Sequence, residues 1–247
     1  MRSFLVLTIL ATLACVGPIS ACAETLDLAL VLAADVSRSI DDQEFKLQRE
    51  GYAAAITNPR VLEAIARGPH GGIAVCFIEW SGPDEQQVVS EWTVIRDGET
   101  AASFAATLLA APRSFFGRTS ISSALDFSRA YLAKAGDVDR RVIDVSGDGT
   151  NNSGRAVRDA RDETLAAGIT INGLAIINQN PNPGYFAHTQ PPEGLPAYYR
   201  QNVIGGPGAF LLVVQDFTTF GEAITNKLIT EIAGARTRSA TRLAKAH

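Results

Sequence analysis

The sequence has few cysteines, no excess of positive charge and no apolar run long enough to cross a membrane. Cys15 and Cys22 lie near the N-terminus, and Cys76 lies inside an apolar, strand-like run. This usage predicts no disulfide, and a lone cysteine in such a strand is typical of a small buried apolar residue. The formal net charge is −4 and no basic stripe is present, which argues against nucleic acid as a partner.

The first 23 residues have the pattern of a signal peptide. Arg2 supplies a positive start, an apolar region follows over residues 3–16, and residues 21–23 read Ala-Cys-Ala, a small-x-small cleavage pattern. The apolar region is too short for a spanning helix. The alternative is a bacterial lipoprotein box at residues 19–22, in which Cys22 would carry a lipid anchor. Both interpretations predict an exported bacterial protein, periplasmic or secreted.

The remaining chain has the size and composition of one large domain. The full sequence has 247 residues and is 46% hydrophobic. A chain of this length and composition can bury a sizeable core. We expect the domain to cover residues 24–234, followed by a basic tail over residues 235–247. Residues 178–208 are rich in Pro, Gly, Asn and aromatic residues. A connection of that length is uncommon in a compact domain, so we predict a loop insertion there.

Apolar strand-like runs alternate with helical patterns along the domain. This order predicts an α/β fold with a mostly parallel sheet. The connection between the second and third strands is too short for a parallel crossover, so we expect these strands to form an antiparallel hairpin. The predicted strands cover residues 26–34, 72–80, 87–95, 141–145, 169–177 and 210–214. The predicted helices cover residues 41–57, 99–109, 120–134, 155–167 and 219–232.

Polar side chains follow two of the buried strands. Asp35, Ser37 and Ser39 come directly after the first strand, Asp148 follows the fourth, and Thr119 lies just before the third helix. In an open α/β sheet, ligands collect at the carboxyl ends of the strands. If the first and fourth strands are neighbours, these five side chains converge. Two carboxylates and three hydroxyls are oxygen ligands of the kind that a hard divalent cation prefers.

Simpler roles compete with this interpretation. Asp and Ser favour helix N-caps, so the three residues after the first strand could cap the following helix. Asp148 and the neighbouring Thr150, Asn151 and Asn152 could form a turn. The combination of Asp148 with Thr119 favours the metal site for Asp148, whereas residues 150–152 are expected to be turn or supporting residues. The three histidines are scattered, without metal-binding spacing.

The charge of the predicted ligand set bears on the cation. Asp35 and Asp148 would roughly neutralise a divalent ion, and three hydroxyls add no charge. Compact oxygen ligation favours Mg²⁺, with Mn²⁺ or Ca²⁺ as alternatives. Because Mg²⁺ usually keeps some water, an exchangeable position should remain for a carboxylate from a partner. This chemistry suits binding and does not by itself break a bond.

The series Asp35-x-Ser37-x-Ser39, Thr119 and Asp148 resembles the metal-ion-dependent adhesion site (MIDAS) of von Willebrand factor type A domains. The resemblance covers about residues 26–232. It implies a Rossmann-like, doubly wound sheet of six strands in the order 3-2-1-4-5-6, with the third strand antiparallel and helices on both faces. It also implies that the three hydroxyls bind metal directly, and the two carboxylates directly or through water. The chain is similar to an uncharacterised exported bacterial branch of that family. Residues 178–208 form a longer segment than a minimal domain needs, so the partners of better-known members are not carried over to this chain.

The expected function is therefore a metal-dependent, non-enzymatic binding module of the cell envelope that recognises an acidic group on a protein partner. One alternative is an interaction domain in which the metal is only structural. A second is a metal-dependent hydrolase, but aspartyl-phosphate enzymes usually carry Asp where this chain has Ser37, and neither a nucleophile elbow nor a phosphate loop is present. We expect a partner-contacting rim at Arg113, Phe116, Arg118, Tyr185 and Phe186, with ordinary packing of their loops as the alternative.

Overall fold

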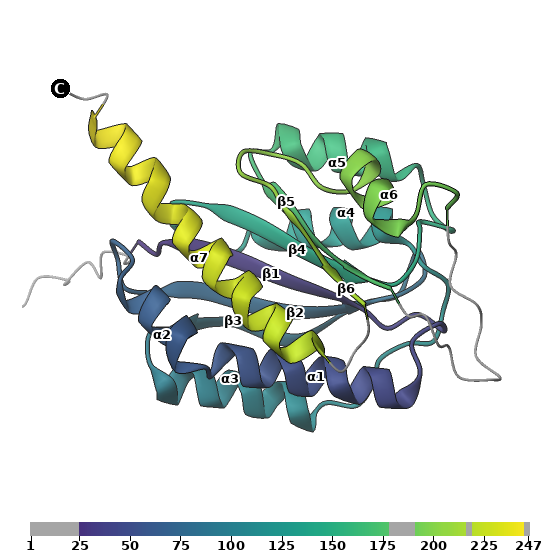
Figure 1. Cartoon of the computed structure of the whole chain (residues 1–247), viewed down its shortest axis with the longest axis horizontal. Helices are drawn as coiled ribbons and strands as arrows, with labels where there is room; N and C mark the ends of the chain where they lie inside the picture. The colour runs from purple at the N-terminus through teal and green to yellow at the C-terminus, as the bar shows by residue number, and fades with distance from the viewer. Residues whose placement is uncertain (1–24, 178–190, 216–218, 245–247) are drawn as a thin grey trace, which may run out of the picture.

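The computed structural model describes residues 25–177, 191–215 and 219–244, so the predicted signal peptide and Cys22 lie outside the described residues. A six-stranded sheet has the order β3-β2-β1-β4-β5-β6, with helices on both faces (Figure 1). The predicted fold class and strand order are confirmed. The strands are β1 (Leu28–Asp35), β2 (Ile73–Trp80), β3 (Gln86–Ile95), β4 (Arg141–Gly147), β5 (Thr170–Ile176) and β6 (Leu211–Val214).

The described helices form two layers. They are α1 (Asp42–Ile56), α2 (Pro59–Ala66), α3 (Gly98–Ala110), α4 (Ile121–Leu132), α5 (Val157–Ala166), α6 (Leu195–Asn202) and α7 (Phe220–Ala244). One apolar cluster packs α1, α2, α3 and α7 against the sheet. A second packs α4, α5 and α6 against the other face. None of these helices is both long and apolar enough to cross a membrane.

The central strands are buried and mostly apolar because both faces of the sheet are covered. Every residue of β1, β2 and β5 is buried. β1 pairs in parallel with both β2 and β4. β3 pairs antiparallel with β2, which confirms the predicted hairpin, and only Ser90 and Ile95 of this edge strand are buried. The first and fourth strands are thus neighbours, and their carboxyl ends meet at one edge of the sheet.

The structure differs from the sequence prediction in three helices. α2 begins immediately after Asn58, whose side chain accepts a hydrogen bond from the Arg60 amide. The Asn58-Pro59 pair therefore ends one helix and starts another, because proline is favoured at the first helical position. α6 lies within residues 178–208, where we expected only a loop. α7 continues past the predicted end at residue 232, and its C-terminal end projects beyond the sheet (Figure 1).

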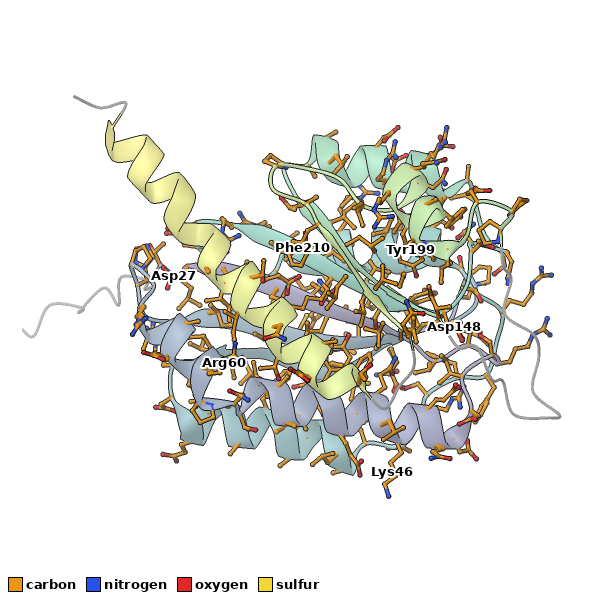
Figure 2. The ribbon with its side chains drawn as sticks, in the orientation of Figure 1. Asp27, Lys46, Arg60, Asp148, Tyr199 and Phe210 are labelled. Atoms are coloured by element: carbon orange, nitrogen blue, oxygen red, sulfur yellow. The ribbon has the colours of Figure 1, made fainter. Side chains whose placement is uncertain are left out.

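The candidate site and the ends of the described chain lie at opposite edges of the sheet. Asp148 lies at the edge of the sheet formed by the carboxyl ends, close to the N-terminal end of α7 in this view (Figure 2). Asp27 precedes β1 and lies at the opposite edge, on the side toward which the C-terminal end of α7 projects (Figure 2). The candidate site and both ends of the described chain are therefore on opposite sides of the domain.

Candidate metal centre

The structure brings together all five side chains of the predicted metal site. The Ser39 hydroxyl donates to Oδ1 of Asp148 at 2.8 Å and lies 3.2 Å from the Ser37 hydroxyl. The Thr119 hydroxyl donates to Oγ of Ser37 at 3.3 Å. Oδ1 of Asp35 accepts a hydrogen bond from the Ser37 amide at 2.7 Å. Continuous polar contacts thus connect the loop after β1, the loop before α4 and the loop after β4.

The loop after β1 is held by backbone hydrogen bonds. The Arg38 amide donates to the Gly117 carbonyl at 3.0 Å, and the Ile40 amide donates to the Ser37 carbonyl at 3.0 Å. The Gln48 amide group donates to the carbonyl of Asp35 at 3.2 Å. These contacts fix the loop so that Asp35, Ser37 and Ser39 turn toward Asp148.

Asp41 carries the helix-capping role that competed with the metal site. Its carboxylate accepts a hydrogen bond from the Glu44 amide, and the Glu44 carboxylate accepts one from the Asp41 amide, each at 2.8 Å. This is a capping box. Because Asp41 caps α1, the polar side chains before it are not needed for that purpose.

Asn152 positions Thr119. Its side-chain oxygen accepts a hydrogen bond from the backbone amide of Thr119 at 3.1 Å, and its backbone amide donates to the Thr119 carbonyl at 2.9 Å. Asn151 makes a parallel connection, because its side-chain oxygen accepts from the Ser122 amide at 2.9 Å. The residues after Asp148 therefore support the site by tying its loop to the loop before α4.

Electrostatics favour a cation between the two carboxylates. Asp35 and Asp148 are fully buried. Burial, and then the neighbouring Asp148, raises the pKa of Asp35 to about 8, although the hydrogen bonds from Ser37 and the charge of Arg113 oppose this shift. Among the described residues, none hydrogen-bonds to Oδ2 of Asp35. A divalent cation would offset the repulsion and supply a partner for that oxygen, so the donor set fits a hard metal ion.

The predicted rim residues have different environments. The Arg113 side chain is only 6% exposed, and it donates to the carbonyls of Val36 and Ser37 at 2.8 and 2.9 Å. Arg113 therefore braces the loop after β1, which is the loop-packing role. Its guanidinium stacks on Phe116 at 3.9 Å from the ring centroid. Phe116 is 61% exposed.

The other rim residues are either peripheral or beyond the described chain. Arg118 is exposed and donates to the Asn152 carbonyl at 2.6 Å, so it also supports the neighbouring loops. Tyr185 and Phe186 lie outside the described residues. Phe116 is therefore the described rim residue with a large exposed apolar surface beside the candidate site.

Sequence reasoning missed Tyr199 as a residue of this site. It had placed Tyr199 only among the aromatic residues of the insertion. Tyr199 comes from α6, is fully buried, and packs within the core on that face of the sheet. The pKa of its hydroxyl is raised by burial and then by Asp35 and Asp148. The only signal in the sequence was the aromatic content of residues 178–208.

A second group of potential ligands lies at the opposite edge of the sheet. Nε2 of His70 is 3.3 Å from Oδ2 of Asp139, and Asp27 lies beside them. The sequence spacing of the histidines gave no sign of this group. The Asp27 carboxylate, however, accepts hydrogen bonds from the amides of His70 and Gly72 at 2.9 and 3.3 Å. Its evident role is to brace the turn before β2.

Comparisons with known proteins agree with the fold. The profile of a family described as a protein of unknown function (DUF1194) matches residues 25–236. No curated protein matches the chain. A von Willebrand factor type A protein from Catenulispora acidiphila aligns with 11% identity and a TM-score of 0.55, over 85% of this chain and 43% of that chain.

Two further solved structures are those of a byssus matrix protein and a pilus adhesin. Proximal thread matrix protein 1 from the mussel byssus, with a zinc-occupied MIDAS motif, has 13% identity and a TM-score of 0.58, over 84% of this chain and 46% of that chain. The pilus adhesin SpaC from Lactobacillus rhamnosus GG has 13% identity and a TM-score of 0.60, over 85% of this chain and 31% of that chain. This chain thus spans less than half the length of these three proteins. The likenesses establish a fold of the von Willebrand factor type A kind.

Proposed function

The chain belongs to the DUF1194 family of proteins of unknown function, and we propose that it is a metal-ion-dependent protein-binding module. The observation that carries the proposal is the contact between Ser39 and Asp148 across two loops, beside the buried Asp35. Five oxygen-bearing side chains meet at the carboxyl edge of the sheet, where ligands bind in open α/β folds. The architecture is that of domains in which such a site binds metal.

The hydroxyls of Ser37, Ser39 and Thr119 would hold the cation, with Asp35 and Asp148 as direct or water-mediated ligands. We propose Mg²⁺, with Mn²⁺ or Ca²⁺ as alternatives, because all five groups offer oxygen. A bound cation supplies an electrophilic position for a carboxylate of a protein partner. The chain contributes the rigid frame, since Arg113 holds the backbone of Val36 and Ser37.

Binding is favoured over catalysis by the same residues. Asp35 is followed two positions later by Ser37, whose hydroxyl contacts Ser39 and Thr119. An aspartyl-phosphate enzyme would usually carry a second carboxylate there. The fold is shared with a pilus adhesin and a byssal matrix protein, which supports an adhesion-type role. Together with the predicted signal peptide, this supports an activity in the bacterial envelope or outside the cell.

Metal binding is tested first, with protein beginning at Glu24. Calorimetric titration with MgCl₂ or MnCl₂ should give one site in the wild type and none in Asp148→Ala. The matched control is Asp162→Ala, because Asp162 is 62% exposed and lies on α5 away from the site. Retained metal binding by a folded Asp148→Ala variant would contradict the assignment.

Partner binding is tested with envelope extract of the source organism. Capture should require Mg²⁺, should be reversed by EDTA, and should fail with Asp148→Ala. Amidation of the carboxyl groups of the extract before mixing should also abolish capture, because the proposed contact is a carboxylate on the metal. Equal capture in Mg²⁺ and EDTA, with metal removal lowering only the melting temperature, would leave the cation a structural role and exclude this proposal.

A further inference from the structure

Helix α6 reaches the candidate metal site through two consecutive tyrosines. The hydroxyl of Tyr198 accepts a hydrogen bond from the Asn151 amide at 3.1 Å, which attaches α6 to the loop after Asp148. Tyr199 turns inward and is fully buried. Figure 2 shows Tyr199 by α6 and Asp148 toward the same end of the sheet. A segment far along the chain is therefore built into the surroundings of the site.

Gly147 separates the Tyr199 hydroxyl from Asp35. A Cβ at Gly147 would lie 2.8 Å from the Tyr199 hydroxyl oxygen and 3.0 Å from Oδ2 of Asp35. Both oxygens thus flank one point, which only a glycine leaves open. This explains why the last residue of β4 carries no side chain: a methyl group there would press on both the phenol and the carboxylate.

The Tyr199 hydroxyl and Oδ2 of Asp35 are complementary as a hydrogen-bond donor and an acceptor. Within the described part of the chain, neither the Tyr199 hydroxyl nor Oδ2 of Asp35 has a hydrogen-bond partner. Burying such groups without partners costs free energy, and buried polar groups in folded proteins nearly always find one. A phenol has one proton to donate, and an ionised carboxylate can only accept. Each group is therefore suited to the other, and because a carboxylate oxygen has two lone pairs, Oδ2 can accept this hydrogen bond and still contact a cation.

We propose that Tyr199 is a positioning residue of the metal site, whose hydroxyl donates a hydrogen bond to Oδ2 of Asp35 through one bridging water molecule. The proposal rests on the metal site proposed above. Oδ1 of Asp35 is already fixed by the Ser37 amide, so a donor at Oδ2 would fix the remaining oxygen and the plane of the carboxylate. Groups that orient metal ligands in this way typically change metal affinity by about 10–100-fold.

This contact links α6 to the metal. If α6 supports Asp35 when metal is bound, then bound metal supports α6 to the same extent, because coupling between two equilibria is reciprocal. Helix α6 thus responds to metal occupancy and also forms part of the site. A partner can then recognise the conformation of α6 as well as the metal.

The test compares Tyr199→Phe with the wild type by calorimetric titration with MnCl₂. We expect about tenfold weaker binding, with a melting temperature in EDTA close to that of the wild type, because the variant removes only a hydroxyl. Tyr131→Phe is the matched control: Tyr131 is also largely buried, but its hydroxyl contacts Glu91 on β3. That variant should bind Mn²⁺ as the wild type does.

Amide hydrogen exchange of α6 supplies a readout that a purely structural role would not change. Mn²⁺ should slow exchange in residues 195–202 of the wild type and Tyr131→Phe, but have a smaller effect in Tyr199→Phe. Wild-type Mn²⁺ affinity in Tyr199→Phe, with equal protection of α6, would overturn the role of Tyr199 and leave the metal site intact. Absence of Mn²⁺ binding in the wild type would overturn both proposals.

Discussion

Lys227 on α7 lies 2.8 Å from Asp144 on β4, and both side chains are fully buried. Lys227 also contacts Glu231 at 2.7 Å, and Glu231 accepts a hydrogen bond from Asn172 at 2.9 Å. Burial alone would lower the pKa of Lys227, but Asp144 and Glu231 raise it above its ordinary value. One buried cation therefore holds two carboxylates and fastens α7 to the centre of the sheet.

Lys227→Met should strongly destabilise the protein. The substitution keeps the length of the side chain but leaves Asp144 and Glu231 buried without their cation. Removing one partner of a buried ion pair typically lowers the free energy of unfolding by about 3–5 kcal/mol. Urea denaturation measures the change. Lys46→Met is the control, because Lys46 is 73% exposed and 3.8 Å from Glu50, and it should cost less than about 1 kcal/mol. Equal stability of both variants would contradict the anchoring role.

The metal-free protein should lose stability as the pH rises. The pKa of Asp35 is raised from 3.8 to about 8 by burial and by Asp148. Between these values the folded protein retains a proton that the unfolded chain releases, so increasing pH favours unfolding. We expect the melting temperature in EDTA to fall between about pH 5 and pH 8.

Two comparisons isolate the contribution of Asp35 to this pH dependence. Burial and Glu231 likewise raise the pKa of Asp144, to about 7, against the opposing charge of Lys227, so part of the decline should remain in Asp35→Asn. Mg²⁺ should reduce the decline in the wild type, because the cation replaces the proton at Asp35. A wild-type curve in EDTA no steeper than that of Asp35→Asn would show that Asp35 does not hold this proton.

Gly147→Ala should weaken metal binding and lower the melting temperature together. Its methyl group would lie 2.8 Å from the Tyr199 hydroxyl oxygen and 3.0 Å from Oδ2 of Asp35, so one of these buried groups must shift. Gly149→Ala is a close control, since a methyl group there would have Thr119 Oγ1 as its nearest neighbour at 3.9 Å. Titration with MnCl₂ and thermal melting should separate the two variants. Similar behaviour would mean that the space at Gly147 is not needed.

Asn152→Ala should reduce metal affinity by about tenfold while the protein remains folded, because Asn152 orients Thr119 without being a ligand itself. The substitution removes the side-chain oxygen that accepts the Thr119 amide at 3.1 Å. The control is Asn226→Ala on α7, whose side chain accepts only a long, exposed hydrogen bond from Arg60 at 3.3 Å. Calorimetric titration gives the comparison, and an unchanged affinity in Asn152→Ala would show that Thr119 is held by other contacts.

The convergence of the five proposed ligands could be predicted because each follows from a local rule. Asp35 and Asp148 come directly after apolar strands, and parallel strands end at a common edge. The hairpin of β2 and β3 followed from the length of its connection. These predictions required only the order of elements along the chain and the direction in which parallel strands run.

The remaining features depend on contacts between distant residues. Nothing near Lys227 in the sequence indicates that Asp144 lies beneath it, because the pairing depends on where α7 crosses the sheet. The location of Tyr199 beside the site could not be predicted for the same reason, since it depends on how α6 folds back over β5. Arg113 precedes an exposed phenylalanine in a polar loop, a pattern typical of a surface residue, and only the fold places it under the loop after β1.

The separation between Asp148 and the two ends of the described chain determines how the domain can be presented. Any surface, bead or neighbouring module joined before residue 25 or after residue 244 attaches on the side of Asp27 (Figure 2). The face that carries the candidate metal site then points away from the attachment. A partner can approach that face without steric interference from the attachment, whichever end supplies it.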